Sequence, residues 1–340
     1  MRIGEREIGP GRPTLVIAEI GVNHDGDVTR ALRLVEAAAN AGADAVKFQL
    51  FRADRLAGDA PLAAYQTGTG GQRELLRSLE LSTAEVESVV AANRDAGRLP
   101  IATPFSPEDV DDVRRLGLPA VKIASPDCVN TLLLRACAEL SVPMLVSTGA
   151  ATMGEVDRLV RDIGDVDLAL LHCVSSYPTP DDAAQLGWIR QLETRCPIVG
   201  YSDHTQNAVT GALAVAAGAR VIEKHLTYDR AAAGPDHAAS FAPAQFANYV
   251  QGIREAEQVM GGGDKSVQPC EQDVRRVSRQ SLALRHGIAA GRVIGAADLT
   301  TRRPGDGLAP SVWVDVVGRR ATRDLPAGTL LSWDLLAKAA

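Results

Sequence analysis

The chain has 340 residues, of which 46% are hydrophobic and 4% aromatic, and its formal net charge at pH 7 is −6. This composition supports a large core and excludes a chain that is disordered throughout, while the few aromatics and the negative charge argue against nucleic acid as a general partner. No apolar run approaches the roughly 20 residues of a membrane helix, so we expect no membrane partner. Five cysteines without CxxC spacing favour a reducing, cytoplasmic location.

Up to about residue 260, short apolar runs alternate with segments of helical periodicity. The eight runs span residues 15–20, 45–50, 99–102, 120–124, 144–147, 168–171, 198–201 and 221–225. Runs that are apolar on both faces are typical of parallel strands buried on both sides. Eight strand–helix units in residues 1–262 therefore predict an α/β fold, a closed (β/α)₈ TIM barrel rather than an open sheet.

The pattern changes after the glycines at 261–263. Residues 263–274 are predicted to be a linker, and residues 275–340 a small β-rich domain with a tight bend at 303–307. Its predicted strands are 281–284, 291–294, 312–317 and 329–332. In the barrel, the long segment 52–80, with glycines at 68, 70 and 71, follows the second strand and is a candidate lid over the active-site face.

Positive charge is concentrated near the C-terminal end. Residues 274–340 carry eleven Lys or Arg against five Asp, a balance of +6, so residues 1–273 carry −12. The split favours a basic C-terminal module that lies against an acidic main body, in the same chain or in a partner. Independent drift of the two parts to different charges is the alternative.

All eight predicted barrel strands end in polar or charged residues, on the side where TIM barrels build their sites. Lys47 and Lys122 are two of only five lysines in a chain that uses Arg elsewhere, and both lie in apolar runs. With the hydroxyls of Thr103, Ser125 and Ser147 they predict an anion site, because two ammonium groups and short donors suit a compact dianion in a cleft that excludes water.

Two histidines, His204 and His225, end the last two predicted strands, which are neighbours in a closed barrel. They are candidate ligands of one divalent cation, with Glu19 or water completing an open shell. This donor set suits Mn²⁺ as a Lewis acid, with Mg²⁺ or Co²⁺ as alternatives. In the other interpretation, one of the two histidines is a capping or core residue and the other binds phosphate. His24 and Asp203 are candidates to support the ligands.

Three further residues are singled out by their position in the pattern. Lys224 lies in a strand-like run, where a movable ammonium group would suit chemistry, whereas His172 lies within a strand and is expected to be a satisfied core residue. Asp236 follows the last strand at the barrel mouth and is a candidate for binding sugar hydroxyls. The alternative is that Asp236 belongs to a solvent-exposed turn.

A set of motifs resembles the sialic acid synthases, which condense N-acetylmannosamine-type sugars with phosphoenolpyruvate (PEP). The motifs are EIGVNHDG (19–26), VKFQ (46–49), ATPFS (102–106), VKIAS (121–125), LHCVSSYPTP (171–180), GYSDHT (200–205), EKHLT (223–227), GPDH (234–237) and RRPGDG (302–307). They occur in order from about residue 15 to the end of the chain. The resemblance implies a TIM barrel followed by a C-terminal domain related to type III antifreeze proteins, the SAF domain.

The resemblance also implies roles for individual residues. The PEP-binding set is Lys47, Thr103, Lys122, Ser125, Ser147 and Ser202, the metal ligands are His204 and His225, and the strand 1 acid is Glu19. The sugar-binding set is Gln49, Asp127, Ser175, Tyr177, Asp236 and Arg303. Arg303 is expected to reach the barrel mouth of a neighbouring subunit, which predicts a domain-swapped homodimer. Asp127, Ser175 and Val277 vary within the family and leave the sugar open.

The expected activity joins PEP to an N-acetylmannosamine-type aldose and yields a nine-carbon 2-keto-3-deoxy sugar acid and phosphate. The acceptor stays open between N-acetylmannosamine, its 6-phosphate and a 2,4-diacetamido-trideoxy hexose that leads to legionaminic or pseudaminic acid. No extra basic cluster is evident, which favours an unphosphorylated sugar. Two other functions are considered: a PEP-dependent synthase acting on a phosphorylated sugar, which would lack the tail domain, and a non-catalytic sugar- or ice-binding homologue.

Overall fold

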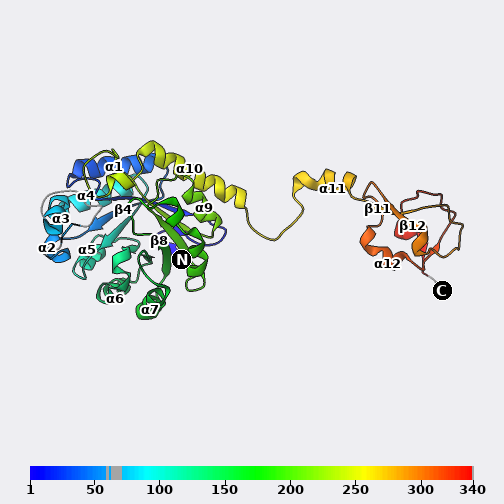
Figure 1. The fold of residues 1–340 in the computed structure, drawn as a ribbon, viewed down its shortest axis with the longest axis horizontal. Coiled ribbons are helices and arrows are strands. Elements are labelled where there is room, and N and C mark those ends of the chain that lie inside the picture. Colours follow the sequence, from blue (N-terminus) through cyan, green and yellow to red (C-terminus); the bar gives the residue numbers. More distant parts are fainter. Residues whose placement is uncertain (59–60, 63–70, 339–340) are drawn as a thin grey trace. The chain divides into compact units, whose positions relative to one another are not determined.

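The computed structural model describes residues 1–58, 61–62 and 71–338, and the chain divides into two compact units, residues 1–262 and 263–340 (Figure 1). Within the described part of the chain, no helix is both long enough and apolar enough to span a membrane. The predicted lid segment contains the short helices α2 (Ala53–Leu56) and α3 (Gln72–Leu79). The glycines at 68 and 70, on which that prediction depended, lie outside the described residues.

The first unit is a closed barrel of eight parallel strands in the order β10-β3-β4-β5-β6-β7-β8-β9, which confirms the predicted fold. Observed and predicted strand ends differ by two residues or fewer. The strands are β3 (Leu15–Gly21), β4 (Ala45–Leu50), β5 (Leu99–Pro104), β6 (Val121–Ile123), β7 (Met144–Ser147), β8 (Leu168–Cys173), β9 (Val199–Asp203) and β10 (Val221–His225).

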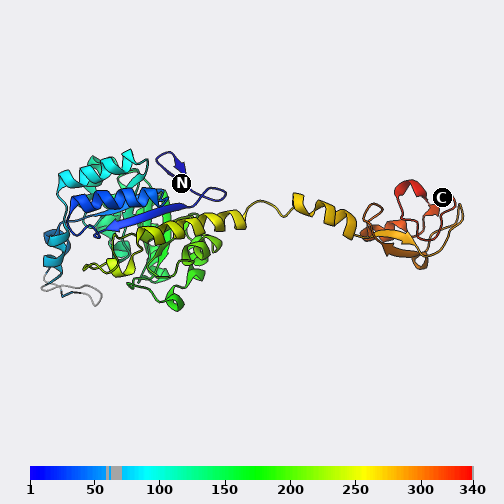
Figure 2. The ribbon, with the colours of Figure 1, turned by 90° about the horizontal axis from the view of Figure 1, so that it is seen from above.

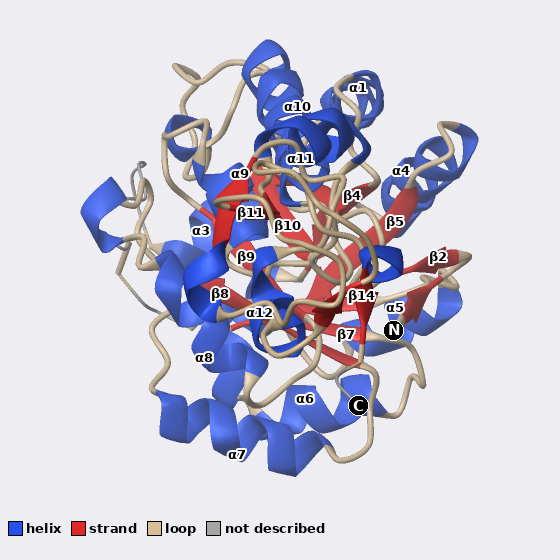
Figure 3. Cartoon of the chain, turned by 90° about the vertical axis from the view of Figure 1, so that its right-hand side faces the viewer, coloured by secondary structure: helices blue, strands red, loops and turns tan. Residues whose placement is uncertain are grey.

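Helices surround the strands, as Figure 3 shows. They are α1 (Val28–Asn40), α4 (Thr83–Asp95), α5 (Asp109–Arg115), α6 (Thr131–Ala138), α7 (Met153–Ile163), α8 (Ile189–Glu193), α9 (Thr210–Ala216) and α10 (Pro243–Met260). Capping boxes start α4, from Ser82 and Glu85, and α7, from Thr152 and Glu155. Each box satisfies backbone N–H groups that a helix start otherwise leaves without a partner.

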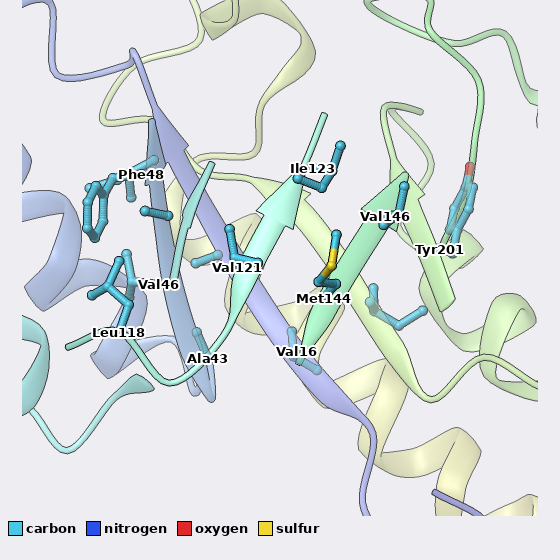
Figure 4. Close-up of a cluster of buried hydrophobic side chains, with 14 of the residues drawn as sticks. Val16, Ala43, Val46, Phe48, Leu118, Val121, Ile123, Met144, Val146 and Tyr201 are labelled. Atoms are coloured by element: carbon cyan, nitrogen blue, oxygen red, sulfur yellow. The ribbon is translucent and has the colours of Figure 1, made fainter. Parts of the chain in front are cut away.

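Strand alternation divides the apolar side chains of the barrel between two clusters. The outer cluster packs the strands against the helices, and Figure 4 shows part of it, including Val16, Val46, Val121 and Val146. The inner cluster fills the barrel near the strand starts, where Ile3 and Ile8 of the N-terminal hairpin, β1 (Arg2–Ile3) and β2 (Arg6–Glu7), pack against it. Figure 2 shows this hairpin at one end of the barrel. Polar side chains are thereby confined to the opposite end of the interior.

The second unit has its own apolar core and two small antiparallel sheets. Its elements are α11 (Gln272–Ser278), β11 (Ser281–Leu284), β12 (Leu299–Arg302), α12 (Trp313–Val316), β13 (Arg320–Ala321) and β14 (Leu336–Ala337). The strand predicted at 281–284 is confirmed, but 312–317 is wrong, because Pro310 starts a 3₁₀ turn that continues into α12. Residues 291–294 and 329–332 form only isolated bridges, at Val293 and Leu330.

Candidate active site

Four charged side chains meet inside the barrel at the carboxyl ends of the strands: Glu19 (β3), Lys47 (β4), Lys122 (β6) and Glu223 (β10), each no more than 5% exposed. Parallel pairing places Glu19 beside Lys47 on one side and beside His225 on the other. These strands position the charges because side chains two residues apart share one face of a strand. The cluster therefore belongs to the barrel wall and not to a loop.

The two lysines share the carboxylate of Glu223. Lys47 Nζ pairs with Glu19, lies 3.4 Å from Glu223 Oε1, and donates to Thr103 Oγ1 at 2.9 Å. Lys122 Nζ lies 3.3 Å from Glu223 Oε2. Both predicted anion-binding lysines are thus held in one place by a carboxylate that the sequence analysis missed.

A signal for Glu223 was present in the sequence. It stands two residues before His225 in the same predicted strand, so the two side chains must share a face. The intervening Lys224 must then face outward. The structure confirms this alternation, since Lys224 is fully buried against the rings of Phe241 and Tyr249, at 4.2 and 5.7 Å from their centroids. The prediction that Lys224 takes part in the chemistry is therefore wrong.

Short hydroxyl side chains surround the lysine end of the cluster. Ser202 donates to Glu223 Oε2 at 3.1 Å, and its Oγ lies 2.6 Å from that of Ser147. The backbone N–H of Gly149 donates to Ser125 Oγ at 3.0 Å. The structure therefore brings together the hydroxyl and ammonium groups that the sequence predicted as one set.

Gly149 is required where the backbone passes these side chains. A Cβ built there would lie 2.4 Å from Ser175 Oγ, 2.9 Å from Ser125 Oγ and 3.0 Å from Cys173 Sγ. Ser175, predicted to bind the sugar, thus lies close to Ser125, which was predicted to bind the anion. Cys173 is a buried thiol of this wall that the sequence analysis missed, and its place at the end of β8 was the available signal.

Burial and neighbouring charges shift the pKa values of Glu19 and Glu223 in opposite directions. Burial raises the pKa of Glu19 to about 7, although the ammonium group of Lys47 opposes the shift. Burial also acts to raise the pKa of Glu223, but Lys122 and Lys47 outweigh it and hold that pKa well below its usual range. Of these two carboxyls, Glu19 is consequently the one whose protonation state can change near neutral pH.

The two predicted metal ligands are neighbours, with ring centroids 5.4 Å apart. His204 Nδ1 bonds to the carbonyl of Val174 at 2.9 Å, and the ring of Tyr177 lies 4.1 Å from its own. His225 Nδ1 is buried, has no hydrogen-bond partner among the described residues, and lies 3.5 Å from Asp236 Oδ2. A buried ring nitrogen without a partner is unfavourable unless a ligand completes it, so the pair fits a bound cation.

The described residues offer two imidazoles to a metal ion but no larger group of ligands. In the described part of the chain, no three His, Cys, Asp or Glu side chains are grouped as a metal shell. Two imidazoles then leave several positions open for water or substrate oxygens. Open positions are typical of catalytic rather than structural metal sites.

The two residues expected to support the histidines do not do so by direct contact. Asp203 faces away from the barrel interior, where its carboxylate accepts from Thr210 and Tyr249, both at 2.6 Å. His24 Nδ1 accepts from the N–H of Gly26 at 3.1 Å, and burial lowers its pKa to about 4. That prediction is wrong because strand alternation and local loop hydrogen bonds determine both orientations.

His172 behaves as the sequence predicted. Its Nε2 lies 2.7 Å from the carbonyl of Ala184, and its ring stacks on that of Tyr201. It faces the outer side of the barrel wall and is a satisfied core residue.

Apart from Ser175, described above, the predicted sugar-binding residues are divided among three places. Three of them lie next to the charged cluster or the histidines. Gln49 is close to Glu19, because a Cβ built on Gly21 would lie 2.5 Å from Glu19 Oε1 and 3.0 Å from Gln49 Nε2. Tyr177 and Asp236 lie beside the histidines. Asp127 accepts from Asn130, the N-cap residue of α6, at 3.1 Å. Arg303 belongs to the second unit, where it forms a cis peptide bond with Pro304.

Comparison with known proteins gives matches over most of the chain. The NeuB family matches residues 34–265, and the SAF domain matches residues 279–337. N,N'-diacetyllegionaminic acid synthase of Legionella pneumophila is 38% identical over 97% of each chain, and N-acetylneuraminate-9-phosphate synthase of Mus musculus is 30% identical over 93% of this chain and 92% of its own. The solved N-acetylneuraminic acid (sialic acid) synthetase of Leptospira borgpetersenii, in complex with citrate, has 32% identity and a TM-score of 0.75 over 81% of this chain and 94% of its own.

Proposed function

This chain belongs to the NeuB family, and we propose that it condenses PEP with an unphosphorylated N-acylamino aldose to give a nine-carbon 2-keto-3-deoxy sugar acid and phosphate. The observation that carries the proposal is the buried pair of lysines, Lys47 and Lys122, in the same barrel mouth as the paired imidazoles of His204 and His225. The SAF domain after the barrel is the one that the sequence predicted.

PEP is assigned to the lysine end of the site. Its phosphate and carboxylate would bind Lys47 and Lys122 together with the hydroxyls of Thr103, Ser125, Ser147 and Ser202. In the structure both lysines are neutralised by Glu19 and Glu223. A dianion must compete with these two carboxylates for the ammonium groups. Fixed donors of this kind stabilise developing charge without reorganisation.

The reaction forms one carbon–carbon bond, replaces the bond between PEP C2 and the phosphate oxygen by a bond to the oxygen of water, and leaves the former aldehyde oxygen as a hydroxyl. PEP C3 attacks the aldehyde carbon of the open-chain sugar, water adds at C2, and the tetrahedral intermediate collapses with loss of phosphate. Glu19, as a carboxylate, is our candidate to take the proton of that water. A divalent cation held by His204 and His225, for which Mn²⁺ is our first choice and Mg²⁺ or Co²⁺ are alternatives, would polarise the aldehyde oxygen when bound.

The acceptor is assigned by class. Gln49, Tyr177 and Asp236, around the histidine end of the site, would contact its hydroxyl and amide groups, and Asp127, Ser175 and Arg303 are the further candidates. N-acetylmannosamine is the first candidate. A 2,4-diacetamido-trideoxy hexose is the second, because the similarity to the L. pneumophila legionaminic acid synthase exceeds that to the mouse enzyme, 38% against 30%.

The test is release of inorganic phosphate from PEP with each sugar in turn. We expect release with one of the two sugars, loss of release after chelation, and recovery with Mn²⁺. The variant His225→Ala should remain inactive when Mn²⁺ is restored, while Lys265→Ala, an exposed residue of the second unit, should match the unmodified protein. Release that survives chelation would contradict the metal assignment, and release with neither sugar would contradict the proposed acceptors.

We further propose a cytoplasmic homodimer in which Arg303 of one subunit completes the barrel mouth of the other. The +6 and −12 charges of the two parts of the chain support the association, and the free state of all five cysteines agrees with a reducing compartment. Mixing inactive Arg303→Ala and His225→Ala subunits should restore activity, since one mixed site is then intact. Activity that stays absent in the mixture would contradict the exchange of domains.

A further inference from the structure

We propose that Asp25 and His237 are positioning residues that join two loops across the barrel mouth and hold Asp236 in place for the acceptor sugar. The inference rests on the proposed function, in which Asp236 binds that sugar. The first loop follows β3 and contains Asp25, and the second follows β10 and contains Asp236 and His237. Because β3 and β10 pair directly, the two loops leave the barrel side by side.

The imidazole of His237 is fixed at both nitrogens. It is fully buried, with Nε2 2.8 Å from Asp25 Oδ1 and Nδ1 2.6 Å from Thr227 Oγ1. An ionised carboxylate can only accept, so Nε2 must carry a proton that it donates to Asp25. With both ring nitrogens engaged, the ring has a single orientation, and His237 holds the backbone immediately after Asp236.

A second connection joins the same two loops. Asn23 Nδ2 donates to the carbonyl of Leu226 at 2.9 Å and to Ser240 Oγ at 2.8 Å, and Ser240 in turn donates to the carbonyl of Asp236 at 2.7 Å. Asn23 and Ser240 are both fully buried. Asp236 is therefore held from two sides, by a hydrogen bond to its own carbonyl and by the fixed ring of its neighbour.

The local backbone is shaped for the contact between Asp25 and His237. Asp25 adopts φ +51°, a conformation that costs free energy in residues other than glycine. A Cβ on Gly234 would lie 2.6 Å from His237 Cδ2 and 3.4 Å from Asp25 Oδ1, so a side chain there would displace the ring. The pair is thus a close contact that the surrounding backbone accommodates.

The other oxygen of Asp25 points toward the rim of the loops. Oδ2 accepts from Tyr228 at 2.7 Å and from Arg30 at 2.6 Å, and both donors are more than 40% exposed. These rim contacts orient the carboxylate but do not reach Asp236. Tyr228→Phe is consequently a matched control, because it removes one hydrogen bond from Asp25 and leaves the His237 contact in place.

Steady-state kinetics with the acceptor and PEP varied separately test the role. For Asp25→Ala we expect KM for the acceptor to rise about tenfold with KM for PEP unchanged, since Lys47 and Lys122 are carried by β4 and β6, whereas the two loops follow β3 and β10. Asp25→Asn keeps an acceptor oxygen for Nε2 and should restore most of the affinity. In an Asp236→Ala background, Asp25→Ala should add no further change in KM for the acceptor. An additive effect, or equal changes in both KM values, would overturn the proposal.

Hydrogen–deuterium exchange of the loop decides the point independently of activity. Asp25→Ala should increase exchange in the segment 226–241, whereas Tyr228→Phe should not. Unchanged exchange in Asp25→Ala would overturn the positioning role, whether or not the enzyme turns over. Failure of the proposed function appears differently, as absence of phosphate release from the unmodified protein with every sugar.

Discussion

Lys224 and Asp203 form an ion pair, with Nζ 3.4 Å from Oδ1, on the outer side of the barrel wall, and each side chain is fully buried. Each residue directly precedes one of the two predicted metal ligands, His225 and His204. Lys224 also donates to the carbonyl of Thr205. The pair therefore connects the carboxyl ends of β9 and β10 on the outer side of the barrel wall, next to the residues that carry the two imidazoles.

Replacing Lys224 by Met should destabilise the barrel by about 3–5 kcal/mol, because it leaves the buried carboxylate of Asp203 without its cation. Denaturant unfolding followed by circular dichroism measures this loss. Lys265→Met, in an exposed part of the second unit, is the control and should change stability by less than about 0.5 kcal/mol. A loss below about 1 kcal/mol for Lys224→Met would mean that desolvation of the pair offsets its attraction.

Glu223→Gln should bind inorganic phosphate more tightly than the unmodified protein and turn over more slowly. The substitution removes the charge that neutralises Lys47 and Lys122, so an incoming anion meets less competition, while the lysines lose the group that orients them. We expect a phosphate Kd several-fold lower and a kcat at least about tenfold lower. Calorimetric titration with phosphate measures the first quantity. Weaker phosphate binding in the variant would show that orientation outweighs charge.

Glu19→Gln should change how stability depends on pH. The folded pKa of about 7 lies above the ordinary 4.5, so the contribution of Glu19 is fully present below pH 4.5 and is lost as pH rises through 7. The free energy of unfolding of the variant should therefore rise relative to that of the unmodified protein between pH 4.5 and pH 7, by up to about 3 kcal/mol. Unfolding curves at pH 5 and pH 8 check this, and equal differences at both would show that Glu19 titrates normally in the fold.

His24→Gln should change the pH dependence of stability on the acid side. The folded pKa of about 4 lies below the ordinary 6.5, so the stability that depends on neutral His24 is complete above pH 6.5 and is lost as pH falls through 4. Up to about 3 kcal/mol of the acid sensitivity of the barrel should disappear in the variant. A series of unfolding curves from pH 7 to pH 4 measures it. An acid limb identical to that of the unmodified protein would contradict burial of the neutral ring.

Sequence patterns predicted the barrel better than the second unit because the two differ in periodic signal. A parallel strand covered on both faces must be apolar over four or more residues, and all eight such runs were recognisable. The strands of the second unit have only two to four residues, too few to show alternation. The run at 312–317 has high strand propensity, yet it forms α12, with Val316 buried and Trp313 and Val314 exposed.

The chemical groups that gather at the barrel mouth could be predicted from the residues alone, because closing eight strands brings all their carboxyl ends to one rim. The residues alone did not determine which side of the wall each group faces. Packing in the folded chain determines that Glu223 faces the lysines and Lys224 the helices. It also brings Asp25 into contact with His237, about 200 residues away along the chain. When both faces of a strand are buried, its sequence does not show which side chains point into the barrel and which point toward the helices. Packing against neighbouring strands and helices determines this orientation.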